Sequence, residues 1–309
     1  MLIHIIGRKN AAGLSTDIQI LTNLFLKQGW EVRFSDYKSL KRFSFWSAKK
    51  YDLNIFLQWA NPTWMKMARK NILIPNPEWF KDKWVKVIPE FDAVFCKTRV
   101  ATTIFKNKNP HTFFTSFTSQ NCHIPEIAKK NRQWLHLAGK SKLKGTHTII
   151  KTWLANPDFP HLTIIQRNAE TTEQQALNLT YMSEFIAQDH LQLLMNQCPV
   201  HICTSATEGF GHSIGEALSC GAIIITTDAP PMNELVTDKR GFLVKPANKQ
   251  MMRLATAYGI DQQGLEKAVR KAMHREMESS LGQNARNFFI YNDHFFKKEV
   301  IKRVETLMK

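Results

Sequence analysis

Short apolar runs recur through the first part of the chain and alternate with longer segments whose apolar residues have helical spacing. Runs rich in β-branched and aromatic residues are typical of strands, and their alternation with segments of helical length predicts parallel strands joined by helices. Strands are expected at residues 1–7, 30–34, 52–57, 71–75, 91–96 and 111–114. The first part of the chain is therefore predicted to form a doubly wound parallel sheet.

A second alternation of the same kind follows a polar, basic stretch at residues 119–131 that contains Pro125. Its expected elements are strands at 134–138, 162–166, 199–204 and 222–227, with helices at 146–154 and from Ser213 onward. Open parallel sheets bind ligands at the carboxyl ends of their strands. We therefore predict two Rossmann-like α/β domains, residues 1–130 and 131–309, with a cleft between the carboxyl edges of their sheets.

The loop between the strand at 199–204 and the following helix reads Glu208-Gly-Phe-Gly-His-Ser-Ile-Gly-Glu216. Gly209 and Gly211 allow tight turns, so that the first N–H groups of the helix can point at a bound anion. Ser213 and Glu216 also fit a capping box, in which Glu216 only satisfies backbone donors. That interpretation leaves Glu208 unexplained, and the loop is predicted to bind an anion together with a sugar.

The same residues, with Gly221 before an apolar strand and Glu234-Leu-Val, resemble the signature of family 4 retaining glycosyltransferases. The resemblance extends upstream to Leu-Ala-Gly-Lys-Ser-Lys-Leu-Lys-Gly at residues 137–145 and downstream to Gly-Phe-Leu-Val-Lys-Pro at 241–246. It covers residues 134–309. It implies the GT-B fold, in which two Rossmann-like doubly wound domains face a central cleft, with a last helix at about residues 284–309 that can pack back on the N-terminal domain.

The resemblance also implies roles for the residues of this loop. Glu208 would bind hydroxyls of the transferred sugar and Glu216 the ribose, and the sugar would keep its anomeric configuration. Lys140 and Lys144 would contact the donor diphosphate, although the family usually has arginine at the first position, and Lys142 is an equal candidate on electrostatics alone. Further donor contacts are expected from Gly13, Gly209, Phe210, Gly211, His212 and Ser213.

One catalytic feature of the family is missing from the first domain. The strand at 71–75 ends in Asn76-Pro-Glu78, where the family usually has a histidine. Asn76 or Glu78 could replace it in catalysis. Either side chain could instead cap the helix that follows, so both interpretations stay open.

Charge and aromatic residues are concentrated in the first part of the chain. Residues 1–135 contain 22 Lys and Arg against 9 Asp and Glu, a net charge of +13, whereas the remainder carries +3. Six of the eight tryptophans precede residue 85, and residues 38–50 place five cations around three aromatic rings. An anionic partner of the first domain is expected, either a membrane surface or nucleic acid, although residues 38–50 also fit a solvated amphipathic helix.

Features that the sequence lacks lead to expectations about cofactor, metal ion and cellular location. The five cysteines are scattered without the spacing of metal ligands, which suits a reducing cytoplasm. The apolar runs are too short to span a bilayer, and a signal peptide is not expected. No Asp-x-Asp occurs, so we expect transfer without a metal or other cofactor, with a UDP- or GDP-sugar as the donor.

These observations predict a cytoplasmic, retaining glycosyltransferase that acts on an anionic or membrane-borne glycan or lipid, with peripheral contact to the inner membrane face as an open question. Two alternatives remain. A DNA-modifying glycosyltransferase would use the same basic surface for phosphates. A non-catalytic GT-B scaffold could bind nucleic acid or an anionic glycan, but the presence of both Glu208 and Glu216 argues against it.

Overall fold

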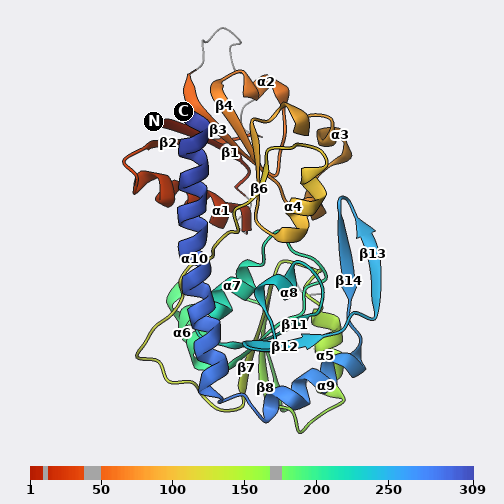
Figure 1. The fold of residues 1–309 in the computed structure, drawn as a ribbon. Helices are drawn as coiled ribbons and strands as arrows, with labels where there is room; N and C mark the ends of the chain where they lie inside the picture. The colour runs from red at the N-terminus through yellow and green to blue at the C-terminus, as the bar shows by residue number, and fades with distance from the viewer. Residues whose placement is uncertain (10–12, 38–49, 168–175) are drawn as a thin grey trace. The chain divides into compact units, whose positions relative to one another are not determined.

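A computed structural model describes residues 1–9, 13–37, 50–167 and 176–309. The chain divides into two compact units. The first contains Met1–Ser119, Met252–Ala255 and Asn292–Lys309, and the second contains Gln120–Met251 and Thr256–Tyr291. Most of the basic, aromatic segment at 38–50 lies outside the described residues. Figure 1 shows the elements of each unit in chain order.

The first unit is built on a six-stranded parallel sheet with the order β2-β1-β3-β4-β5-β6. Its strands are β1 (Leu2–Gly7), β2 (Glu31–Asp36), β3 (Tyr51–Leu57), β4 (Ala68–Ile74), β5 (Ala93–Cys96) and β6 (Thr112–Phe114). Its helices are α1 (Gly13–Leu26), α2 (Pro62–Met65), α3 (Asp82–Val85) and α4 (Arg99–Lys106), with short 3-10 helices η1 (Pro77–Trp79) and η2 (Ile88–Glu90). The predicted doubly wound sheet is confirmed.

The second unit contains another six-stranded parallel sheet, with the order β12-β11-β10-β7-β8-β9. Its strands are β7 (Gln133–Gly139), β8 (His161–Gln166), β9 (Leu179–Met182), β10 (Val200–Cys203), β11 (Ile223–Thr227) and β12 (Gly241–Val244). Its helices are α5 (Thr146–Leu154), α6 (Gln188–Gln197), α7 (His212–Ser219), α8 (Met232–Leu235) and α9 (Gln262–Met273). A two-stranded sheet of β13 (Asn248–Met252) and β14 (Ala255–Gly259) follows β12.

Helices lie on both faces of the second sheet (Figure 1). Trp134 and Ile164 belong to a core with side chains of α5 and α9, whereas the alternate residues Leu135 and Ile165 pack in a separate cluster with Met195 of α6. A sheet covered on both faces needs apolar residues at nearly every strand position. This explains why the runs of the sequence are continuous rather than alternating.

The last helix, α10 (Ser279–Met308), belongs to both units, with the division after Tyr291. Beyond it, Asn292 donates from Nδ2 to the Phe117 carbonyl at 2.6 Å, and its Oδ1 accepts from the Ser116 hydroxyl at 2.6 Å. The Phe296 ring packs on the Phe117 ring at 4.7 Å between centroids. The core of the first unit therefore includes residues from both ends of the described chain. No helix within the described ranges is long and apolar enough to cross a membrane.

A buried ion pair lies at the carboxyl end of β5. Lys97 directly follows this strand, and its ammonium donates to the Asp17 carboxylate of α1. Only 3% of the Lys97 side chain and 1% of the Asp17 side chain are exposed, and the ammonium lies 4.7 Å from the centre of the Phe117 ring. Burying such a pair costs free energy, because both charges lose their contact with water.

Removing one member of this pair should therefore destabilise the protein more than removing both. Lys97→Met leaves the Asp17 carboxylate buried beside an apolar side chain, and we expect a loss of about 3–5 kcal/mol in the free energy of unfolding. The double variant Lys97→Met/Asp17→Leu should recover most of that loss in urea unfolding. A double variant no more stable than the single variant would show that the pair itself stabilises the fold.

Candidate functional site

The carboxyl ends of β7 and β10 lie next to each other in the second sheet. From β7 the chain continues through α5 to β8 on one side, and from β10 it continues through α7 to β11 on the other side. The strand order thus reverses between these two strands, and ligands of open α/β sheets bind at such a reversal. The loops at residues 140–145 and 204–211 leave the sheet at this point.

Hydrogen bonds and a very close approach join these two loops. The Ala206 N–H donates to the Leu143 carbonyl at 2.8 Å, and the Thr204 hydroxyl donates to the Lys144 carbonyl at 3.2 Å. Gly145 has a φ of +72°, and a Cβ atom there would lie 2.7 Å from the Thr204 carbonyl oxygen. Both the backbone conformation and the space therefore require glycine at residue 145.

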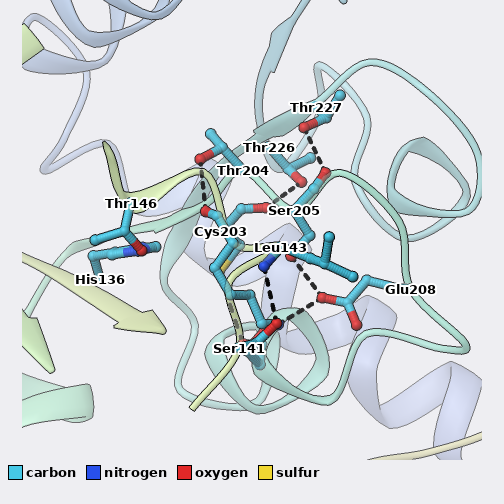
Figure 2. A network of polar contacts seen from close by, with 12 residues as sticks. His136, Ser141, Leu143, Thr146, Cys203, Thr204, Ser205, Glu208, Thr226 and Thr227 are labelled. Carbon is cyan, nitrogen blue, oxygen red and sulfur yellow. Dashed lines mark hydrogen bonds and ion pairs between the residues drawn. The ribbon is translucent and has the colours of Figure 1, made fainter. Parts of the chain in front are cut away.

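His136 holds the strands below the loops in place. This side chain is fully buried in β7, and its ring nitrogens contact the Ile202 carbonyl at 2.7 Å and the Thr146 hydroxyl at 2.9 Å. Figure 2 shows His136 beside Thr146. Burial lowers the pKa of His136 to about 4, so the ring is neutral at physiological pH. Since a carbonyl can only accept, Nδ1 carries the proton and Nε2 accepts from Thr146. His136 thus connects β7, β10 and the start of α5.

The centre of the site is an ion pair between the two loops. Lys144 Nζ lies 2.6 Å from Glu208 Oε1 and donates a second bond to the Ser213 hydroxyl at 2.9 Å. The Ser205 hydroxyl donates to the same Glu208 oxygen at 2.6 Å. Ser205 is itself positioned by Thr227 of the neighbouring strand β11, whose hydroxyl donates to the Ser205 carbonyl at 2.9 Å (Figure 2).

The environment keeps this pair ionised. Burial by itself raises the pKa of Glu208, but the charge of Lys144 and the hydrogen bonds from Lys144 and Ser205 outweigh it and leave the pKa below its usual value. Burial likewise lowers the pKa of Lys144, and Glu208 reverses that effect to give a net increase. The site therefore contains a carboxylate and an ammonium, each neutralised by the other.

Glu216 is in a different electrostatic state. It lies in α7, is half-buried, and its pKa is raised by burial, against the weaker opposing charges of His212 and Lys144. Two carboxyl groups of the same site are thus shifted in opposite directions. Such divergence is common where the groups of a site have separate tasks.

Helix α7 begins one residue earlier than the sequence suggests. Its N-cap is Gly211, with a φ of +108°, and the Gly215 N–H donates to the Gly211 carbonyl at 2.9 Å. The capping-box interpretation is therefore wrong, because Ser213 lies within the first turn and its hydroxyl accepts from Lys144. The first amides of a helix have no partner within it, so this terminus offers N–H donors beside Lys144.

The structure separates the three candidate lysines. Lys144 is largely buried in the ion pair, whereas Lys140 and Lys142 are exposed. Within the glycine loop, Gly209 and Phe210 are buried, and the Phe210 ring contacts the half-buried His212 ring at 5.7 Å between centroids. The sequence candidates of the second unit thus divide into an enclosed cluster around Lys144 and two surface lysines.

The remaining candidates belong to the first unit. Gly13 is the exposed first residue of α1, and residues 10–12 before it are not described. Asn76 directly precedes η1 and is 8% exposed, and Glu78 lies within η1 and is 3% exposed. The Asn76 side chain makes no capping bond to this helix, so the capping interpretation of Asn76 is wrong. Its Oδ1 is buried and has no hydrogen-bond partner among the described residues.

Three residues of the second-unit site were absent from the sequence candidates. Thr204 and Ser205 form the start of the glycine loop, and His136 interrupts an apolar strand. The histidine was the one visible signal, since a polar residue inside a buried strand must find partners. Among the described residues, no group of three or more His, Cys, Asp or Glu side chains is arranged to hold a metal ion.

The two parallel sheets define an α/β protein of the GT-B class, and comparison with known proteins gives its family. Residues 100–288 match the family described as Glycosyl transferases group 1, which is more than half of the chain. The protein belongs to this family. No curated protein matches the chain in sequence.

Solved structures of similar fold cover nearly the whole chain. Sucrose-phosphate synthase from Thermosynechococcus elongatus is 13% identical with a TM-score of 0.75, over 99% of both chains. Anabaena Alr3699/HepE, solved in complex with UDP-glucose, is 17% identical with a TM-score of 0.71, over 99% of this chain and 100% of that one. The pneumococcal O-GlcNAc transferase GtfA is 12% identical with a TM-score of 0.64 over 83% of this chain. At these identities the likeness establishes the GT-B fold.

The close approach of the two loops can be tested with a pair of glycine substitutions. Gly145→Ala meets the Thr204 carbonyl, whereas Gly139→Ala also has a positive φ, +58° against +72°, but open space around its Cβ. Both should lose about 1–2 kcal/mol in the free energy of unfolding because of the left-handed backbone. Gly145→Ala should lose clearly more in urea unfolding, and equal losses would contradict the steric requirement.

Proposed function

We propose that this protein is a retaining glycosyltransferase that binds a UDP- or GDP-sugar in its second unit. The observation that carries the proposal is the Lys144–Glu208 pair beside the N-terminus of α7, at the reversal of strand order. An ammonium and the amides at a helix N-terminus suit a diphosphate. Carboxylates suit sugar hydroxyls, so Glu208 is assigned to the transferred sugar and Glu216 to the ribose.

In the proposed reaction, an acceptor hydroxyl oxygen forms a bond to the anomeric carbon while the bond from that carbon to the donor phosphate oxygen breaks. The electron pair of the broken bond leaves with the nucleoside diphosphate, and the acceptor proton passes to a donor phosphate oxygen. Lys144 and the amides at residues 210–213 stabilise the charge that develops on the diphosphate. These groups are already in place before the reaction, which is what electrostatic stabilisation requires.

We further propose that transfer needs no metal ion. The sequence contains no Asp-x-Asp pair that could present a divalent cation to a diphosphate. Lys144 and the α7 terminus supply positive charge at the same place. Lys140 and Lys142 are exposed on the loop after β7, outside the ion pair.

The first unit is proposed to bind the acceptor. Residues 1–135, most of which belong to this unit, carry a net charge of +13, which favours an anionic or membrane-borne glycan or lipid, in the cytoplasm or at its membrane face. The buried amide oxygen of Asn76 has no partner among the described residues and could accept a bond from an acceptor hydroxyl, and Glu78 is buried in the turn that follows. Duplex DNA is the second candidate acceptor, favoured by the same charge.

The donor assignment predicts stabilisation of the protein by nucleotide sugars. In thermal-shift titrations against UDP- and GDP-sugars, at least one should raise the melting temperature of the wild type. Lys144→Gln should weaken the binding of that nucleotide sugar by about ten- to a hundredfold, because a hydrogen bond to a charged group contributes about 1.5–3 kcal/mol. Lys142→Gln is the matched control and should bind almost as well as the wild type. If no nucleotide sugar stabilises the wild type, the donor site is wrongly assigned.

The acceptor assignment predicts selective binding to anionic membranes. The wild type should sediment with vesicles of phosphatidylglycerol and not with vesicles of phosphatidylcholine. This binding should weaken when the salt concentration is raised from about 50 to about 200 mM, because salt screens the attraction between charges. Duplex DNA measured at the same salt concentrations tests the second candidate. Tighter binding to DNA would favour the DNA-modifying enzyme, and indifference to both would contradict the argument from charge.

A further inference from the structure

The ion pair at the centre of the site joins two groups that the proposed function assigns to different parts of the donor. Lys144 is assigned to the diphosphate and Glu208 to the sugar, yet their charged atoms lie 2.6 Å apart. Both side chains are largely buried, with 14% of Lys144 and 17% of Glu208 exposed. Both assignments belong to the proposed function, and the role of the pair in ligand binding rests on them.

Both members of the pair are held in their present positions. Glu208 Oε1 accepts from Lys144 and from Ser205, each at 2.6 Å. Lys144 Nζ uses two of its three N–H groups, on Glu208 and on the Ser213 hydroxyl. A phosphate oxygen at Lys144 would therefore either displace Glu208 or share the charge of the ammonium with it.

We propose that Glu208 and the donor diphosphate compete for Lys144, and that this competition makes the site select a nucleotide sugar over the free nucleoside diphosphate. Glu208 is then a specificity-determining residue of the reaction. With a nucleotide sugar bound, the sugar hydroxyls donate to Glu208 and replace the bond that it loses. With a nucleoside diphosphate bound, Glu208 loses the bond from Lys144 and keeps the one from the Ser205 hydroxyl.

The cost of that second state follows from burial. A largely buried carboxylate that loses its cation keeps the desolvation penalty without the attraction that compensated it. Hydroxyl donors of a sugar offset this penalty, and a bare diphosphate has no such donor near Glu208. The free nucleotide is thus bound less tightly than its phosphate contacts alone would give. After transfer removes the sugar, Glu208 can return to Lys144 and favour release of the nucleoside diphosphate.

Ser205 has a positioning role in this exchange. Its hydroxyl keeps Glu208 Oε1 at the loop whether or not Lys144 is in contact, and its own carbonyl is held by Thr227. The carboxylate therefore changes partner without leaving the site. A site in which Glu208 swung out into solvent would not discriminate between the two ligands.

Calorimetric titration of Glu208→Gln tests the competition. The probes are UDP and UDP-glucose, or GDP and GDP-mannose if the wild type binds guanine nucleotides. Glutamine keeps the size of the side chain and removes its charge. We expect the Kd of the free nucleotide to fall by about tenfold, while the Kd of the nucleotide sugar stays the same or rises. The preference of the wild type for the sugar-bearing ligand is then largely lost.

Matched variants separate this effect from simple loss of charge or fold. Glu266→Gln removes a carboxylate of the same unit from an exposed pair with Arg270, and both Kd values should remain as in the wild type. If Glu208→Gln does not fold, Glu208→Asp shortens the side chain by one methylene and should shift the preference in the same direction by a smaller factor. Unchanged or weaker nucleotide binding by the Glu208 variants, or an equal change for both ligands, overturns the proposal. A wild type that binds neither ligand would instead contradict the donor site itself.

Discussion

The contact between the loops after β7 and β10 is the constraint on which the rest of the site depends. Gly145 lets the backbone pass within reach of Thr204, and hydrogen bonds from Thr204 and Ala206 then hold the loops together. Only this approach allows Lys144 from one loop to reach Glu208 from the other. The parallel sheet supplies the two adjacent strand ends, and the buried His136 connects the strands beneath them. The charges are therefore positioned by backbone packing more than by their own attraction.

Much of this arrangement could be predicted from the sequence, because its signals are local. The apolar runs indicated the strands, and Gly209, Gly211 and Glu208 marked the loop. What the sequence could not indicate was partnership between loops that are about sixty residues apart. The sequence alone does not distinguish Lys140, Lys142 and Lys144 from one another. In the structure, Lys144 is largely buried and the other two are exposed. Ser213 looked like a cap for the same reason, since its contact with Lys144 is not local.

In the first unit, the sequence predicted the strands but not the environment of buried polar side chains. Its strands were readily recognised, but apolar patterning carries no information about polar side chains buried at strand ends. Lys97 was counted among the basic residues of a charged surface, whereas it is enclosed with Asp17. Asn76 was considered as a possible helix cap, whereas its amide oxygen is buried without a partner among the described residues. Both residues follow buried strands of one parallel sheet, and ligands of open α/β sheets bind at this carboxyl edge.

The shared helix α10 has a consequence for how the chain folds during synthesis. Residues 1–119 leave the ribosome long before residues 292–309, but Phe296, Val300 and Val304 are fully buried parts of the same unit. The second unit is made entirely of residues between these two segments. It can therefore complete its core first, while Phe117 and its neighbours in the first unit still lack their covering side chains. The N-terminal part of the chain is then the last to become fully packed, whereas N-terminal domains usually fold first during synthesis.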